Sequence, residues 1–131
     1  MAKKRRAKKL RVAFIGTGMI SELHMIALAG MDDVEMVAFA DISKAALEER
    51  SARFGVSDCF TDYNEMLRKV KPDAVSVCTP NGVHAASTIA ALRAGAHVIV
   101  EKPMAMNPRE AQAMITAAKK HRRKLVIGFQ Q

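Results

Sequence analysis

Short apolar runs alternate with helical segments along the whole of this chain, and this alternation restricts the fold more than any other feature of the sequence. The runs lie at residues 11–15, 36–40, 57–60, 74–78, 97–100 and 125–129. Most are apolar nearly throughout, as is typical of parallel strands buried on both faces, whereas 57–60 predicts only a very short strand. Strands of this kind joined by helices predict an α/β protein with helices on both faces of a parallel sheet.

The helical segments are marked by apolar residues at helical spacing and by capping residues at their ends. The apolar positions of the first segment are Ile20, Leu23, Ala27, Leu28 and Met31. Ser43 and Asn107 are predicted N-caps, and Asp62 followed by Glu65 resembles a capping box that starts a helix over 63–70.

Six strands in two halves predict a doubly wound, three-layer α/β/α sheet of the Rossmann type, with strand order 3-2-1-4-5-6. The length of 131 residues matches one ordinary domain. We therefore expect residues 10–131 to form this Rossmann domain and residues 1–9 to form a disordered basic arm.

The formal net charge of +8 is concentrated in two short segments. Seven of the 21 Lys and Arg residues lie within residues 1–11, and five more lie within 119–124. The remainder has 9 basic and 13 acidic residues, so the body of the protein is mildly acidic. A basic arm can bind phosphates without specificity, but this one carries no aromatic residue and the chain has no nucleic-acid motif. We expect no specific nucleic-acid partner.

The sequence also restricts the compartment. No apolar run approaches the roughly 20 residues that a membrane span needs, and no signal-peptide pattern precedes the first strand. Cys59 and Cys78 lack metal-ligand spacing and lie in apolar surroundings, which favours small buried thiols in a reducing compartment. We expect a soluble cytoplasmic protein with no metal site and no membrane partner.

The first candidate site follows the first strand, at Gly16-Thr17-Gly18-Met19-Ile20. Gly16 would permit a tight turn, and Gly18 would let the backbone approach a pyrophosphate held at the positive end of the next helix. Ser21 stands where this motif usually has Gly or Ala. The alternative is an ordinary strand-to-helix turn.

The second candidate is Asp41, at the end of the second strand and 23 residues after Gly18. A carboxylate there can accept both hydroxyls of an adenosine ribose and repel a 2′-phosphate, so it favours NAD over NADP. Lys44 lies close enough in sequence to soften that preference. The alternative is that Asp41 serves only as a helix cap or turn residue.

Two further clusters follow the fourth and fifth strands. Cys78-Thr79-Pro80-Asn81-Gly82-Val83-His84 lies at the edge of the sheet where ligands bind in this fold. Asn81 is a predicted cap for the next helix, and a lone His84 in its first turn is more often exposed or capping than catalytic. Glu101-Lys102-Pro103 places a charged pair after a buried strand, where Lys102 could transfer a proton beside a nicotinamide. The alternative is a salt bridge at the strand end.

Taken together, these residues resemble the amino-terminal domain of the glucose–fructose oxidoreductase, inositol dehydrogenase and rhizopine-catabolism family (Gfo/Idh/MocA). The resemblance covers about residues 9–131, and its most specific part is Glu-Lys-Pro after Thr-Pro-Asn. It is carried by Gly16–Ser21, Ala40-Asp41, Thr61–Tyr63, Cys78–Asn81 with His84, Ala94–Val98, Glu101–Pro103 and Gly128-Phe129.

The resemblance implies roles for individual residues. Gly16, Gly18, Met19 and Ile20, with Thr17 between them, match the pyrophosphate turn, and Asp41 matches the acid that binds the adenosine ribose. The stretch beside the nicotinamide ribose is matched by Thr79, Pro80, Asn81 and His84. Glu101 and Lys102 match a dyad on the cofactor side in which the Lys is catalytic and assists proton transfer. The implied activity is hydride transfer between NAD(P) and a sugar, a cyclitol or a related alcohol or carbonyl compound.

One departure from the family is large, because its members continue into a second α/β domain that supplies most substrate contacts. This sequence stops at Gln131, so we expect the cofactor-binding part alone to bind NAD without turnover. An apolar face left by the missing domain would favour a homo-oligomer. The alternative function is a non-catalytic module that senses a dinucleotide, against which Lys102 argues.

Overall fold

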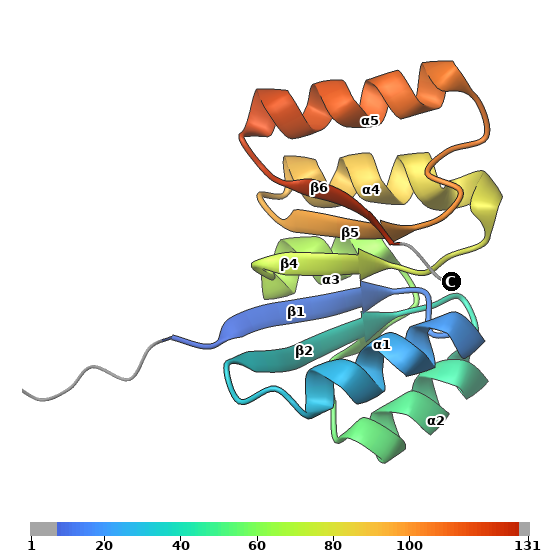
Figure 1. Ribbon diagram of the computed structural model, residues 1–131. Helices are drawn as coiled ribbons and strands as arrows, with labels where there is room; N and C mark the ends of the chain where they lie inside the picture. The colour runs from blue at the N-terminus through green and yellow to red at the C-terminus, as the bar shows by residue number, and fades with distance from the viewer. Residues whose placement is uncertain (1–7, 129–131) are drawn as a thin grey trace, which may run out of the picture.

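The chain folds around one parallel sheet with helices on both of its faces, as the computed structural model of residues 8–128 shows (Figure 1). The strand order is β3-β2-β1-β4-β5-β6, and every neighbouring pair is parallel. This confirms the predicted Rossmann topology. The elements in chain order are β1 (Leu10–Ile15), α1 (Met19–Ala29), β2 (Val34–Ala40), α2 (Lys44–Phe54), β3 (Cys59–Phe60), α3 (Tyr63–Val70), β4 (Ala74–Val77), η1 (Asn81–Val83), α4 (His84–Arg93), β5 (His97–Glu101), α5 (Pro108–His121) and β6 (Leu125–Gly128).

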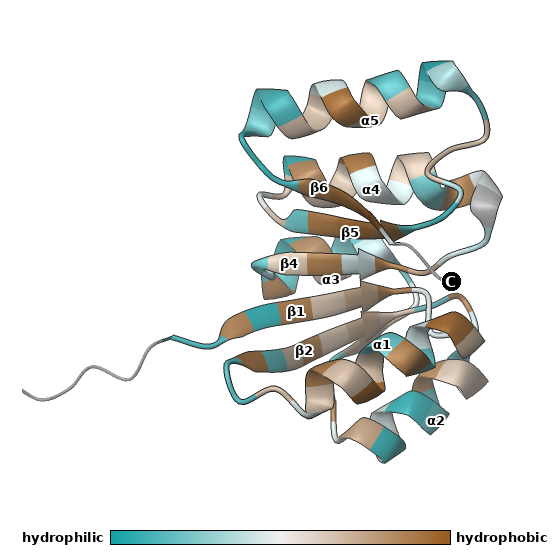
Figure 2. Ribbon diagram, in the orientation of Figure 1, coloured by the Kyte–Doolittle hydropathy of each residue, from teal (hydrophilic) through white to brown (hydrophobic). Residues whose placement is uncertain are grey.

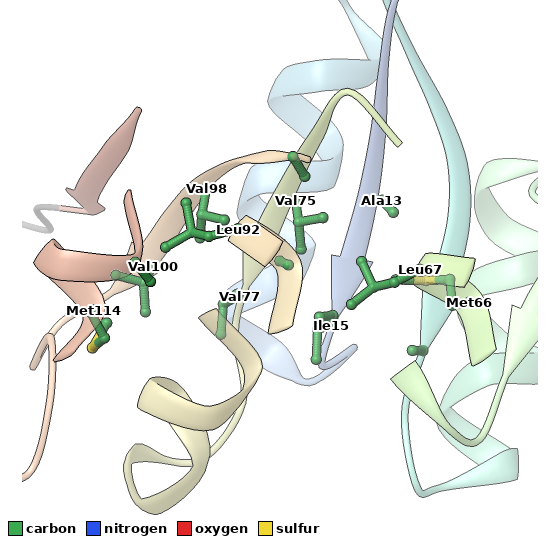
Figure 3. Close-up of a cluster of buried hydrophobic side chains, with 14 of the residues drawn as sticks. Ala13, Ile15, Met66, Leu67, Val75, Val77, Leu92, Val98, Val100 and Met114 are labelled. Carbon is green, nitrogen blue, oxygen red and sulfur yellow. The ribbon is translucent and has the colours of Figure 1, made fainter. Parts of the chain in front are cut away.

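The sheet separates two apolar layers, because alternate side chains of a strand point to opposite faces. In β1, Phe14 belongs to the layer that α1 and α2 cover, where its ring meets the ring of Phe39 edge-on at 5.8 Å between centroids. Ile15 belongs to the larger layer, which α3, α4 and α5 cover. Figure 2 shows the hydrophobic colouring along the strands, and Figure 3 shows valines of β4 and β5 packed against Leu92 and Met114 in the larger layer.

Most helix boundaries agree with the caps predicted from the sequence. Ser43 Oγ accepts the N–H of Ala46 at 3.2 Å, and Asn107 Oδ1 accepts the N–H of Glu110 at 2.9 Å. Asp62 caps α3, but the reciprocal half of the expected capping box is replaced by an ion pair of Glu65 with Lys69, at 2.8 Å.

The face that α1 buries differs from the expected one. The buried residues are Ser21 and Met25, and Leu28 packs against the same apolar layer as Met25. Leu23 is 61% exposed, Ile20 is also exposed, and Met31 lies beyond the last residue of the helix. The helix is apolar around most of its circumference, so the spacing of apolar residues identifies the helix but does not identify its buried side.

Two expectations concern the ends of the chain and the membrane. Residues 1–7 of the predicted basic arm, and Phe129 of the predicted last strand, lie outside the described residues. Within residues 8–128, no helix is long and apolar enough to cross a bilayer.

Candidate functional site

The carboxyl ends of the strands form one edge of the sheet, and the turns after β1, β2, β4 and β5 all lie along it (Figure 1). Strand β1 pairs with β2 on one side and with β4 on the other, so the order in which successive strands join the sheet changes direction at β1. Such a switch point leaves a crevice between the two turns, and ligands of open α/β sheets bind there.

Gly16 is required by the close contact between the turn after β1 and the turn after β4. Its φ is +94°, and a Cβ at this position would lie 2.6 Å from the carbonyl oxygen of Cys78 and 2.8 Å from the nitrogen of Thr79. Real Cβ atoms do not approach backbone atoms so closely, and the positive φ disfavours any other residue as well.

Gly18 has a different environment from Gly16. Its backbone is extended, with φ −77° and ψ −167°, and a Cβ there would have no atom within 4 Å among the described residues. It is also the N-cap of α1, where no side chain of the described part accepts a hydrogen bond from the first turn. The open approach and the exposed N–H groups fit an anion such as a phosphate.

Asp41 is held by backbone and side-chain donors beside this turn. Its Oδ2 accepts hydrogen bonds from Thr17 N at 2.8 Å and Thr17 Oγ1 at 2.7 Å, and its Oδ1 accepts one from Ser43 N at 2.8 Å. A carboxylate has about four acceptor positions, so three bonds leave room for about one more. A ribose would therefore form one hydrogen bond to Asp41 unless an existing bond were exchanged.

A pocket of about 260 Å³ opens beside Asp41, between the turns after β1 and β4. Its lining residues are Ile15, Gly16, Ala40, Asp41, Ile42, Thr61, Tyr63, Thr79, Pro80, Gly82, Val83 and Ser87. Most of that surface is apolar, and the buried Oγ1 of Thr79 has no hydrogen-bond partner among residues 8–128. An apolar pocket with few polar groups is typical of a site for a flat organic ligand, and a buried hydroxyl without a partner is uncommon unless a ligand or water meets it.

His84 connects the turn after β4 to the turn after β5. It is the first residue of α4 and is buried, with Nδ1 2.8 Å from the carbonyl oxygen of Pro103 and Nε2 2.6 Å from that of Thr79. It is thus neither exposed nor capping. The N-cap position of α4 is occupied by Val83, so the prediction that Asn81 caps this helix is wrong. Asn81 instead begins the short helix η1.

Glu101 and Lys102 differ sharply in burial although they are adjacent. Glu101 ends β5, is 4% exposed and pairs with Nε2 of His24, which comes from α1. Gly128 packs against its carboxylate, since a Cβ there would lie 3.3 Å from Glu101 Oε1. Lys102 is exposed at the edge of the sheet. The Glu101 carboxylate at the end of β5 therefore contacts α1 through His24 and β6 through Gly128, and it is adjacent in sequence to the exposed Lys102.

Sequence reasoning did not find two residues at this edge. His24 lies 77 positions from Glu101 in the sequence, and Arg50 of α2 donates from Nε to the carbonyl oxygen of Thr17 at 3.2 Å, across 33 positions. Neither belongs to a motif, because long-range contacts of this kind leave no local pattern. Within the described residues, no group of three or more His, Cys, Asp or Glu side chains could hold a metal ion.

Burial raises the pKa of the Cys78 thiol to about 11, with a smaller contribution from the charge of Glu101 and partial opposition from a hydrogen bond with Ser76. The thiol stays protonated at neutral pH, and it is not a nucleophile there. Both cysteines are free thiols.

Comparison with known proteins identifies the family and the fold of this chain. The profile of a family described as "Oxidoreductase family, NAD-binding Rossmann fold" matches residues 10–129. The chain is 39% identical over 121 residues to D-glucoside 3-dehydrogenase of Escherichia coli, covering 92% of this chain and 34% of that protein. It is 33% identical to scyllo-inositol 2-dehydrogenase (NADP⁺) of Bacillus subtilis, covering 84% of this chain and 34% of that protein.

Among solved structures, the chain resembles the WlbA dehydrogenase of Chromobacterium violaceum in complex with NADH and UDP-GlcNAcA. The TM-score is 0.89 at 33% identity, and the match covers 93% of this chain and 35% of that one. The chain therefore spans about a third of the length of the relatives it matches.

The two glycines of the turn are expected to respond oppositely to a methyl group. Gly16→Ala should lower the free energy of unfolding by more than about 3 kcal/mol, because the methyl meets the Cys78 carbonyl and φ is positive. Gly18→Ala, whose methyl meets open space, should stay within about 1 kcal/mol of the wild type. Urea unfolding followed by circular dichroism measures both, and equal stability of the two variants would contradict the packing described.

The Cys78 thiol should resist alkylation in the folded protein. At about pH 9, a pKa of about 11 leaves roughly 1% thiolate, against about half for the ordinary value of 9.0 in the unfolded chain. Alkylation of Cys78 by iodoacetamide should therefore be about fiftyfold slower in buffer than in urea. Peptide mass spectrometry measures both rates, and similar rates would show that the thiol is not buried.

Proposed function

The chain belongs to the Gfo/Idh/MocA oxidoreductase family with its NAD-binding Rossmann fold, and on this premise we propose that it binds NAD in the crevice between the turns after β1 and β4. The observation that carries the proposal is the turn at Gly18. Its open approach and the uncapped N-terminus of α1 lie beside a mostly apolar pocket with Asp41 at its edge. An anion site, a carboxylate and an apolar pocket in this order are what an adenosine diphosphate requires.

Each part of the site supports one part of the cofactor. The pocket lined by Ile42, Tyr63 and Val83 would hold the adenine, and Asp41 would accept one ribose hydroxyl. The N–H groups at Gly18 and Met19 would bind the pyrophosphate. The unpartnered hydroxyl of Thr79 would then meet the cofactor rather than remain unsatisfied.

Asp41 favours NAD over NADP in this arrangement. Its carboxylate would lie against a 2′-phosphate, and like charges at that distance repel. Lys44 at the start of α2 is exposed and is the cation nearest to Asp41 in the sequence. The charge of Asp41 stands next to the ribose position itself, so we propose NAD as the preferred cofactor.

In the full-length protein, the domain of residues 10–131 would work together with a part that binds the substrate. The bound cofactor supplies the chemistry of hydride transfer, between nicotinamide and a carbinol carbon of a sugar, a cyclitol or a related compound. Lys102, exposed at the carboxyl edge beside the buried Glu101, would accept the hydroxyl proton during oxidation and return it during reduction. Formation of NADH by the full-length protein with a panel of polyols and sugars tests this activity.

Calorimetric titration of this chain with NADH and NADPH tests the cofactor proposal. NADH should bind more tightly than NADPH, and Asp41→Asn should weaken NADH binding by about tenfold and narrow the difference between the two cofactors. Asp58→Asn, an exposed carboxylate outside the pocket, serves as the matched control and should bind as the wild type does.

Two outcomes would contradict the proposal. Folded protein that binds neither cofactor would exclude the dinucleotide site. An Asp41→Asn variant whose preference for NADH equals that of the wild type would exclude the role of this carboxylate in selecting the cofactor.

A further inference from the structure

The turn that follows β1 accepts hydrogen bonds from an arginine of α2 that belongs to none of the sequence motifs. Arg50 of α2 donates from Nε to the carbonyl oxygen of Thr17 at 3.2 Å and from Nη2 to that of Gly18 at 3.5 Å. Its side chain is 11% exposed, which is low for an arginine on a surface helix. Building on the NAD-binding function proposed above, we propose that Arg50 is a positioning residue for the pyrophosphate.

Peptide geometry explains how Arg50 would act on a ligand that it does not touch. In a trans peptide unit, the C=O and the following N–H point in opposite directions. Because Arg50 holds the oxygens of Thr17 and Gly18 on the α2 side, the N–H groups of Gly18 and Met19 point away from α2. The N–H of Thr17 already donates to Asp41 and that of Gly16 to Ala40, so Gly18 supplies the free amide of the turn, next to the unpaired first-turn N–H groups of α1 that begin at Met19.

The other contacts of this region reinforce the same orientation. Ser21 Oγ donates to the carbonyl oxygen of Gly18 at 2.6 Å, so that oxygen is held from the helix as well. This gives a function to the serine that stands where the motif usually has Gly or Ala. Glu22 of α1 and Glu49 of α2 pair with the guanidinium of Arg50 and fix its position.

The carboxylates of Glu22 and Glu49 determine whether the charge of Arg50 or the geometry of its donors acts on the ligand. They offset much of its positive charge, so attraction between Arg50 and the ligand is weakened. The planar fork of donors, which reaches two carbonyl oxygens at once, is not offset in this way. A lysine keeps the charge but has a single nitrogen in place of the Nε and Nη2 that reach the two oxygens, so Arg50→Lys separates the two contributions.

Arg53 provides a matched control on the same helix. It also pairs with Glu22, but its guanidinium carbon lies 5.3 Å from the ring centroid of Phe54. Its side chain is 41% exposed. Arg53→Met therefore removes an arginine and an ion pair with Glu22 while leaving the two bonds from Arg50 to the turn in place.

The experiment compares wild type, Arg50→Met, Arg50→Lys and Arg53→Met by calorimetric titration with NADH, ADP and adenosine, and by thermal unfolding. Arg50→Met should bind NADH and ADP about tenfold more weakly and adenosine within about twofold of the wild type, because adenosine has no phosphate. Arg50→Lys should remain at least about fivefold weaker for ADP. Arg53→Met should bind all three ligands as the wild type does.

The outcomes separate this proposal from the proposed function. A wild type that does not bind NADH contradicts the function itself. If the wild type binds NADH, the role of Arg50 is overturned by normal ADP binding in Arg50→Met, by an equal loss for adenosine, by full recovery in Arg50→Lys, or by an equal loss in Arg53→Met. If thermal unfolding shows that Arg50→Met does not fold, the proposal is tested by comparing the ADP affinity of the folded Arg50→Lys variant with that of Arg53→Met.

Discussion

The contact between the turn after β1 and the turn after β4 is the constraint on which the rest of the site depends. Gly16 lies so close to the backbone of Cys78 and Thr79 that no side chain fits there. The N–H of Cys78 donates to the carbonyl oxygen of Ile15, and the N–H of Gly16 donates to that of Ala40, each at 2.8 Å. These bonds join the ends of three neighbouring strands, so the crevice has fixed walls.

The remaining contacts at this edge extend the same rigid frame outward from the sheet. Asp41 accepts hydrogen bonds from Thr17, and His24 pairs with Glu101. His84 joins the turn after β4 to the turn after β5. Each of these side chains contacts an element other than its own. Binding sites built on rigid elements place their donors accurately without the cost of ordering a loop when the ligand arrives.

The sequence allowed the fold to be predicted because buried parallel strands are apolar nearly throughout and the helix caps have local chemistry. The starts of α2, α3 and α5 follow from such local capping residues, whereas the strand order follows from the doubly wound topology that six strands in two halves predict. The face of α1 could not be predicted, because its apolar residues surround the helix and a small Ser21 is buried instead.

The candidate site was predictable to a more limited extent. Motifs identify the turn at Gly16 and the acid Asp41, but they do not show that Asp41 already accepts three hydrogen bonds within the protein. Burial of His84 and the contact of Arg50 with Thr17 depend on the packing of separate elements, which leaves no local pattern. These packing contacts, rather than the motif residues alone, determine which amides of the turn are left for a ligand.

The central claim is that this crevice at the carboxyl edge is a dinucleotide site. It is tested most directly by recording amide resonances of the ¹⁵N-labelled chain during titration with NADH. The account predicts saturable shifts at Gly18, Met19, Asp41 and Thr79, with little change along α5 on the far side of α4. Saturable shifts confined to α4 and α5, with the resonance of Gly18 unmoved, would contradict it.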